Sequence, residues 1–146
     1  MLLNETDRKN LILHILNKEK LIDGYSKFYS IINLLKDDFV DAFGHYEFNS
    51  SFLTVKDKVL DDDLNALLFD GLATNDEVNL DLSHTHKIEI SANGSAHLIV
   101  RNVERSLKSK IGADLLKKID ETVAKYNRMQ INEVMTLVKS KSDLSS

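Results

Sequence analysis

The 146-residue sequence contains no cysteine and no proline, and it has only five glycines. Without cysteine the chain has no disulfide, no thiolate nucleophile and no zinc or iron–sulfur site with sulfur ligands. Since proline breaks helix interiors, its absence is compatible with a chain made mainly of helices. Any reaction chemistry would have to come from carboxylates, hydroxyls, amines and the five histidines.

Long apolar runs are also missing from the sequence. No run approaches the roughly 18 residues that span a bilayer, and the N-terminus lacks a basic segment followed by an apolar stretch. Hydrophobic residues nevertheless make up 42% of the chain, which is enough for one compact core. We therefore expect a soluble cytoplasmic protein that does not contact a membrane.

The formal net charge of −4 argues against a protein that coats nucleic acid indiscriminately, because such binding depends on neutralising phosphates. The charge is unevenly distributed, however. Residues 1–75 hold 8 basic against 13 acidic residues, whereas residues 101–128 hold 8 basic against 4 acidic ones. Sequence-specific regulators often concentrate positive charge on one face, although a solvated helix surface would have the same composition.

Hydrophobic residues recur at helical spacing in the first 40 residues. They predict one helix over residues 6–20 and a second over residues 25–39. Asp23-Gly24 separates the two, because glycine tolerates the backbone angles of a sharp reversal. Two helices joined by so short a link are expected to pack against each other.

The helical pattern lapses after residue 40. A helix exit at residues 42–44 and a short extended segment over residues 45–49 precede a third helix of about 15 residues. Gly71 is expected to close this helix in the left-handed conformation. The candidate caps at its start are Ser50, Ser51 and Thr54.

Alternating apolar and polar residues follow the third helix. The pattern over residues 77–82 and 87–90 predicts an antiparallel hairpin with a polar turn at residues 83–86. In an alternative register the turn lies at residues 92–95, where Asn-Gly is a strong hairpin signal, and residues 97–100 form the second strand. A three-stranded meander would reconcile both registers.

Helical spacing returns beyond Ala96 and continues to the C-terminal region. It predicts a helix up to Ile111, a break at Gly112, a helix ending near Tyr126 and a last short helix over residues 131–138. Residues 139–146 are serine-rich and charged, which is typical of a frayed tail.

Several short motifs occur in a distinctive order along this chain. A leucine-rich helix containing residues 62–68 ends at Asp70-Gly71-Leu72, and the second strand ends in Ile90-Ser91-Ala92-Asn93-Gly94, whose serine is placed to cap the next helix. Over residues 6–107 the chain thereby resembles the winged-helix transcriptional regulators of the PadR and MarR type, small archaeal or bacterial proteins. In those families the corresponding strand ends in Leu-Thr-x-x-Gly, and serine here replaces threonine.

The resemblance implies an α+β, mostly helical fold: a winged helix-turn-helix with a β-hairpin wing and additional C-terminal helices. It divides the chain into a winged-helix domain (1–107), C-terminal helices that dimerise or complete the core (108–138) and a flexible tail (139–146). The implied function is sequence-specific binding of double-stranded DNA by a homodimeric transcriptional regulator that needs no cofactor. The third helix would enter the major groove.

The candidate DNA-contacting residues lie at the start of the second helix, at the start of the third helix and at the tip of the wing. They are Tyr25, Ser26, Lys27, Ser51, Thr54, Lys56, Lys58, His84, Thr85, His86 and Lys87. Three consecutive carboxylates, Asp61 to Asp63, oppose phosphate contact, and the wing has no arginine. The alternative function is therefore a winged-helix module that contacts another protein and binds no DNA.

The C-terminal helices carry more apolar surface than a small winged core obviously needs. A two-fold dimer formed through them would place two third helices on a palindromic site, whereas helices that fold back would complete the monomer's own core. The candidate dimer residues are Leu107, Ile111, Leu115, Leu116, Ile119, Val123 and Tyr126.

No sequence motif indicates an enzyme or a metal site. The chain has no glycine-rich phosphate loop, nucleophile elbow or His-Glu zinc motif. His84 and His86 would share one face of a strand, but no third ligand is near them in the sequence. Asp61 to Asp63 point about 100° apart on a helix, so they do not converge on one ion and are interpreted as a solvated face.

Overall fold

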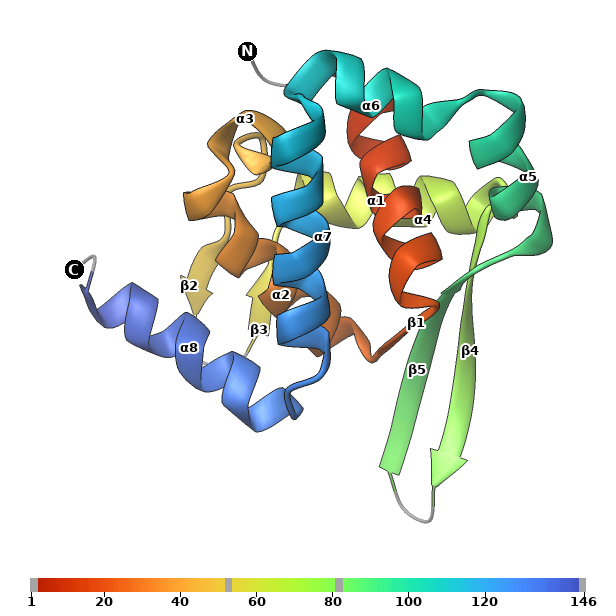
Figure 1. Cartoon of the computed structure of the whole chain (residues 1–146). Helices are drawn as coiled ribbons and strands as arrows, with labels where there is room; N and C mark the ends of the chain where they lie inside the picture. Colours follow the sequence, from red (N-terminus) through yellow and green to blue (C-terminus); the bar gives the residue numbers. More distant parts are fainter. Residues whose placement is uncertain (1–2, 52–53, 81–82, 145–146) are drawn as a thin grey trace.

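The computed structural model describes the backbone of residues 3–51, 54–80 and 83–144, and it describes their side chains except at 49–51, 54–56, 77–80, 83–86 and 142–144. The described chain is mostly helical, with one three-stranded antiparallel sheet and one separate two-stranded sheet (Figure 1). In chain order the elements are α1 (Glu5–Glu19), β1 (Leu21–Asp23), α2 (Tyr25–Asp38), α3 (Val40–Phe43), β2 (Asn49–Ser51), β3 (Thr54–Lys56), α4 (Lys58–Phe69), β4 (Ala73–Leu80), β5 (Ser83–Ile90), α5 (Ala92–Val100), α6 (Val103–Ile111), α7 (Ala113–Asn127) and α8 (Ile131–Leu144).

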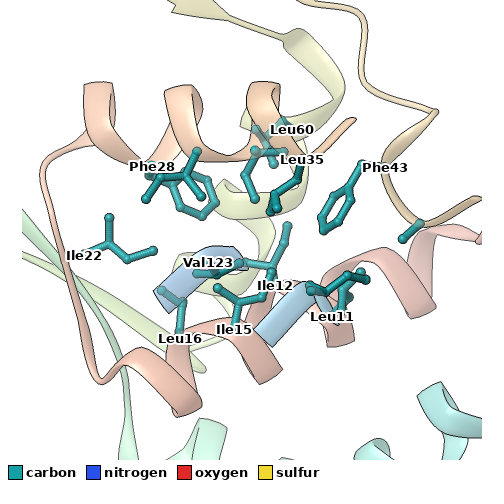
Figure 2. Close-up of a cluster of buried hydrophobic side chains, with 14 of the residues drawn as sticks. Leu11, Ile12, Ile15, Leu16, Ile22, Phe28, Leu35, Phe43, Leu60 and Val123 are labelled. Atoms are coloured by element: carbon teal, nitrogen blue, oxygen red, sulfur yellow. The ribbon is translucent and has the colours of Figure 1, made fainter. Parts of the chain in front are cut away.

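Helix α1 lies at the centre of the molecule. The Asn4 side chain caps it by accepting a hydrogen bond of 2.9 Å from the Asp7 backbone N–H. All residues from Leu11 to Leu16 are buried, since α4, α5, α6, α7 and β5 contact α1. Figure 2 shows side chains of α1 meeting Phe28 and Leu35 of α2 and Val123 of α7 in one cluster. The first two helices thus share one core cluster, and α7 packs against both of them.

The predicted hairpin forms, with longer strands than the sequence pattern indicated. Strands β4 and β5 pair from Ala73↔Ile90 to Leu80↔Ser83, and the hairpin projects from the helical body (Figure 1). Residues 83–86, predicted as a turn, belong to β5, and the connection at residues 81–82 lies outside the described residues. The third strand, β1, pairs with β5, so the sheet order is β1-β5-β4.

The alternative hairpin register is wrong, because residues 97–100 are helical. The Ser91 Oγ accepts a hydrogen bond of 3.0 Å from the Gly94 N–H and thereby starts α5. Gly94 is packed closely, since a Cβ added there would lie 2.1 Å from the backbone oxygen of Leu72. The Asn-Gly pair therefore occupies the first turn of a helix, where the absence of a side chain lets α5 approach the end of α4.

The start of the third helix differs from the prediction. Residues 54–56 form β3, which pairs with β2 at residues 49–51, so Ser50, Ser51 and Thr54 are not its caps. Asp57 is the cap instead, and its Oδ2 accepts a hydrogen bond of 2.8 Å from the Leu60 N–H. Helix α4 consequently has 12 residues and ends at Phe69, and the φ of 73° at Gly71 confirms the predicted left-handed exit.

The helices after the hairpin contain one break more than predicted and extend further. The helix predicted up to Ile111 is divided into α5 and α6 at Arg101 and Asn102, where Asn102 has a φ of 50°. Helix α8 continues to Leu144, so the frayed tail predicted from residue 139 is wrong for residues 139–144. Lys141 anchors this segment, because its Nζ donates 2.5 Å to the Asn33 backbone oxygen and lies 3.0 Å from Asp37.

The C-terminal helices complete the monomer's own core. Helix α7 packs against α1 and α2, and α8 packs against α2. Among the residues predicted to dimerise, four are at most 2% exposed and three are partly buried against the same core. The four are Leu107, Leu116, Ile119 and Val123, and the three are Ile111, Leu115 and Tyr126. The four buried residues cannot contact a second copy, which corrects that part of the dimer prediction.

In the described part of the chain, no helix is both long enough and apolar enough to cross a membrane.

Candidate functional site

Helix α4 has a buried face and an outward face. It lies against α1, and its position after Asp57 sets which residues point inward (Figure 1). The buried residues are Leu60, Asp63, Leu64 and Leu67, and the exposed ones are Lys58, Val59, Asp62, Asn65 and Phe69. We refer to these five exposed residues as the outward face of α4.

Asp63 is a carboxylate on the buried face, and its charge is compensated. The Arg8 Nε donates to its Oδ2 at 3.0 Å, and the Arg8 Nη2 donates to its Oδ1 at 3.4 Å. The Tyr46 hydroxyl donates to the same Oδ2 at 2.9 Å. Because a buried charge is tolerated only when it is paired and hydrogen-bonded, this network explains how Asp63 can be 2% exposed.

The surroundings of Asp63 shift the pKa of both partners. Burial lowers the pKa of Arg8, but the hydrogen bond to Asp63 and its charge outweigh burial, so the pKa is raised overall. Burial raises the pKa of Tyr46, and the negative charge of Asp63 and the hydrogen bond to it raise it further. Arginine thus stays charged and tyrosine neutral throughout the physiological pH range, which holds the network in one state.

Asp61 also points toward the body of the protein. The Tyr29 hydroxyl donates a hydrogen bond to the Asp61 Oδ1, linking α2 to α4. Burial raises the pKa of Tyr29, and the hydrogen bond to Asp61 adds to the effect. The solvated acidic face predicted for Asp61 to Asp63 is therefore corrected: of the three carboxylates, Asp62 alone lies on the outward face.

The residues around the N-terminus of α4 are fixed by one side chain. The Asp57 carboxylate accepts hydrogen bonds from the N–H groups of Leu60 and Glu47, each at 2.8 Å. Lys58 follows this cap directly and is exposed. The other predicted residues of this region lie in strands, and their side chains are outside the described part of the structure; they are Ser51, Thr54 and Lys56.

The start of α2 is tied to neighbouring elements. The Tyr25 hydroxyl accepts a hydrogen bond from the Asn75 side chain of β4, and its ring stacks on Tyr29 at 6.4 Å. The Lys27 Nζ donates 2.6 Å to the Asn127 backbone oxygen at the end of α7, so this amine is engaged within the protein. Of the three residues predicted here as DNA contacts, Ser26 is the exposed one.

The β4–β5 hairpin contains the remaining candidates. The backbones of His84, Thr85 and His86 pair with residues 77–79 of β4, and their side chains are outside the described part of the structure. Lys87 is half-buried and stands in register with Asp23 of β1 and Asp76 of β4. Residues directly opposite across a sheet share a face, so two carboxylates offset the positive charge of Lys87.

The outward face of α4 combines several binding chemistries. Lys58 is a cation suited to a phosphate, and Asn65 has the donor and acceptor that match the edge of adenine. Val59 and Phe69 are apolar, and Phe69 is 89% exposed. Val59, Asn65 and Phe69 were not among the sequence-predicted contacts, because helical spacing does not show which side of the helix faces outward and Asp61 to Asp63 were expected to face the phosphates.

Among the described side chains, no group of three or more His, Asp or Glu residues is arranged to hold a metal ion. Comparison with known proteins gave no match: no family model fits the chain, and no curated protein or solved structure is significantly similar to it.

Proposed function

We propose that this chain is a winged-helix DNA-binding protein, a transcriptional regulator in which α4 is the recognition helix and the β4–β5 hairpin is the wing. The order of elements supports the proposal: α1, β1, α2 and α4 precede a hairpin that extends from the helical body (Figure 1). The sheet order β1-β5-β4 joins this hairpin to the strand between the first two helices. An α-helix with one face free of the body fits the width of the major groove.

The observation that carries the proposal is the inward direction of Asp61 and Asp63. Three carboxylates on a groove-facing helix would repel the phosphates on both sides of the groove. With Asp61 bonded to Tyr29 and Asp63 bonded to Arg8, the outward face retains one acid, Asp62, and one base, Lys58. Arg8 compensates the charge of Asp63, and the hydrogen bond to Tyr29 directs the half-buried Asp61 away from the outward face, which weakens the electrostatic objection to a DNA-reading α4.

On the outward face of α4, one residue would contact the DNA backbone and two would contact bases. Lys58, at the N-terminal end of α4, would bind a backbone phosphate, since lysine is a compact point charge. Asn65, about two turns further along, would pair with an adenine edge, and Val59 would contact a thymine methyl group. Phosphate contact would fix the position of the helix, and the other two contacts would supply sequence preference.

A second candidate function, a winged-helix module that binds a protein, is favoured by one specific observation. Phe69 and Val59 are 89% and 36% exposed on the outward face, which contains a single basic residue. Exposed aromatic side chains are typical anchors of protein interfaces. Such binding would not show the steep salt dependence that phosphate contacts impose.

A salt titration with paired lysine variants tests the proposal. Duplexes of about three helical turns are selected from a random pool at low salt, and their affinity is measured by fluorescence anisotropy between about 50 and 200 mM salt. We expect Lys58→Ala to weaken binding and to lower the slope of log affinity against log salt by about 1. Lys117→Ala, which removes the same charge from an exposed position on α7, is the matched control and should leave the slope unchanged.

Two results would contradict the proposal. If no duplex is retained at about 50 mM salt, the chain does not bind DNA and the protein-contact function replaces it. If Lys58→Ala and Lys117→Ala change the slope equally, binding does not run through α4.

A further inference from the structure

Helix α5 has an apolar face that no part of the described chain covers. Its exposed residues recur at helical spacing, and Ile99 and Val100 are 80% and 78% exposed. The exposed set is Ala92, Asn93, Ala96, Ile99 and Val100. The opposite face is anchored, since Gly94 is buried and the His97 Nε2 lies 3.1 Å from the Asn10 Oδ1 of α1.

Phe69, a third exposed hydrophobic residue, lies at the end of α4 near the N-terminal end of α5. The Ser91 N–H donates 3.0 Å to the Leu72 oxygen, and the Ser91 hydroxyl donates 2.6 Å to the Gly71 oxygen. The N-terminus of α5 therefore rests on the residues that follow Phe69. Helix α5 has nine residues and is about 13 Å long. Phe69 lies near its N-terminal end, and Ile99 and Val100 lie at its C-terminal end.

The two ends of α5 also carry opposite charges. Exposed Asp70 adjoins Phe69 at the end where α5 begins. Exposed Arg101 follows Val100 directly, and exposed Arg105 lies in the first turn of α6, after the break at Asn102. Glu104, the nearby acid, lies 3.6 Å from Lys108, which offsets its charge. Helix α5 thus has an exposed acid near its N-terminal end and exposed bases after its C-terminal end.

We propose that this face binds a second copy of the chain, with the two α5 helices antiparallel about a two-fold axis. In that arrangement the acidic end of each helix meets the basic end of the other, so the Asp70–Arg101 attraction occurs twice. Ala92 and Ala96 allow the two helices to approach closely, and Ile99 and Val100 cover the junction with the partner's Phe69. Self-complementarity of charge and apolar surface is what an isologous interface requires.

The area that a stable interface needs shows which elements would take part in it. A stable interface buries about 800 Å² on each partner, which is more than one nine-residue helix supplies. The start of α6 follows α5 in the chain, and Gly71 and Leu72 join the end of α4 to the start of α5, so these two segments would contribute the remainder. The dimer surface is thereby moved from the buried residues of α7 to α5.

Charge reversal combined with mass measurement tests the proposal. The mass of the full chain is followed by sedimentation velocity in the absence of DNA over two decades of concentration, with circular dichroism as the check on folding. We expect a dimer for the wild type and about a tenfold higher dissociation constant for Asp70→Arg and for Arg101→Asp. The double variant Asp70→Arg/Arg101→Asp should regain the wild-type constant, because each attraction is restored with its sign exchanged.

A hydrophobic pair of variants supplies the second readout. Ile99→Glu should give a folded monomer, and Val40→Glu should remain a dimer, because Val40 is 55% exposed on α3, outside α5. A wild-type monomer at every concentration, a dimer unaffected by Ile99→Glu, or a folded double variant that stays weak would each overturn the proposal. Because DNA is absent from these measurements, loss of the dimer and loss of DNA binding are distinguishable.

Discussion

The two faces of α4 each include one side chain that is unusual for its position. The buried face includes a carboxylate, Asp63, whereas the outward face includes the most exposed aromatic ring among the described residues, Phe69. Buried charges and large exposed apolar groups are both uncommon in proteins. Arg8 and Tyr46 explain why the Asp63 carboxylate can be buried. No described residue explains why the Phe69 ring is exposed. We therefore assign Asp63 a structural role and Phe69 a binding role.

The buried carboxylate determines the rotation of α4 about its axis. Asp63 must reach both Arg8 and Tyr46, and neighbouring helix positions differ by about 100° in direction. A rotation that buried Asp62 instead would leave Arg8 and Tyr46 without their acceptor. The network on the inner face thus selects which residues the outer face presents.

Removal of the Arg8 side chain should lower the free energy of unfolding more than any other change predicted here. We expect Arg8→Ala to lower the free energy of unfolding by about 3 to 5 kcal/mol, because Asp63 would remain buried without its cation. Urea unfolding followed by circular dichroism measures the change. Lys9→Ala is the control: Lys9 pairs with Glu5 at 3.6 Å on the surface and should cost under about 0.5 kcal/mol. A loss below about 1 kcal/mol for Arg8→Ala would mean that the network does not hold α4.

Removal of the Tyr46 hydroxyl should have a smaller effect that depends on pH. At pH 7 we expect Tyr46→Phe to cost about 1 to 2 kcal/mol, since one hydrogen bond to Asp63 is lost. The folded-state pKa of Tyr46 is raised, so its contribution is complete below the unfolded value near 10 and is lost as the pH rises above it.

Above pH 10 the stability of the wild type should therefore depend on pH more steeply than that of Tyr46→Phe. The wild type should lose up to about 1.4 kcal/mol per pH unit above pH 10 from this one group, because unfolding then releases the tyrosine proton. That component should be missing in Tyr46→Phe, and unfolding midpoints in urea between pH 8 and about 11 measure it. Parallel curves for the two proteins would show that Tyr46 ionises equally in both states.

The sequence predicted those parts of the fold that depend on local signals. Ser91 as a cap and Gly71 as a left-handed exit are residues whose chemistry suits one position, and both were confirmed. Residues 50–57 instead contain several equally good caps, and the strand pairing of β2 with β3 decides in favour of Asp57. Strand β1 has three residues, too few to show a period.

The candidate site was less predictable, because its decisive contacts join distant parts of the chain. Asp63 meets Arg8 across 55 positions, and Lys27 meets the Asn127 oxygen across 100. Helical spacing gives the relative directions of neighbouring residues but not which direction is inward. The inward placement of Asp61 and Asp63, and the engagement of Lys27, follow from tertiary packing alone.

A map of backbone amide shifts on DNA addition tests the central claim, that Lys58, Val59 and Asn65 on the outward face of α4 read DNA. The ¹⁵N-labelled protein is titrated with a selected duplex at low salt, and each amide is followed by nuclear magnetic resonance. The account predicts the largest shifts along α4, at Lys58, Val59, Asp62 and Asn65, with α8 unchanged. Saturable binding whose shifts are confined to α7 and α8, with α4 unaffected, would contradict it.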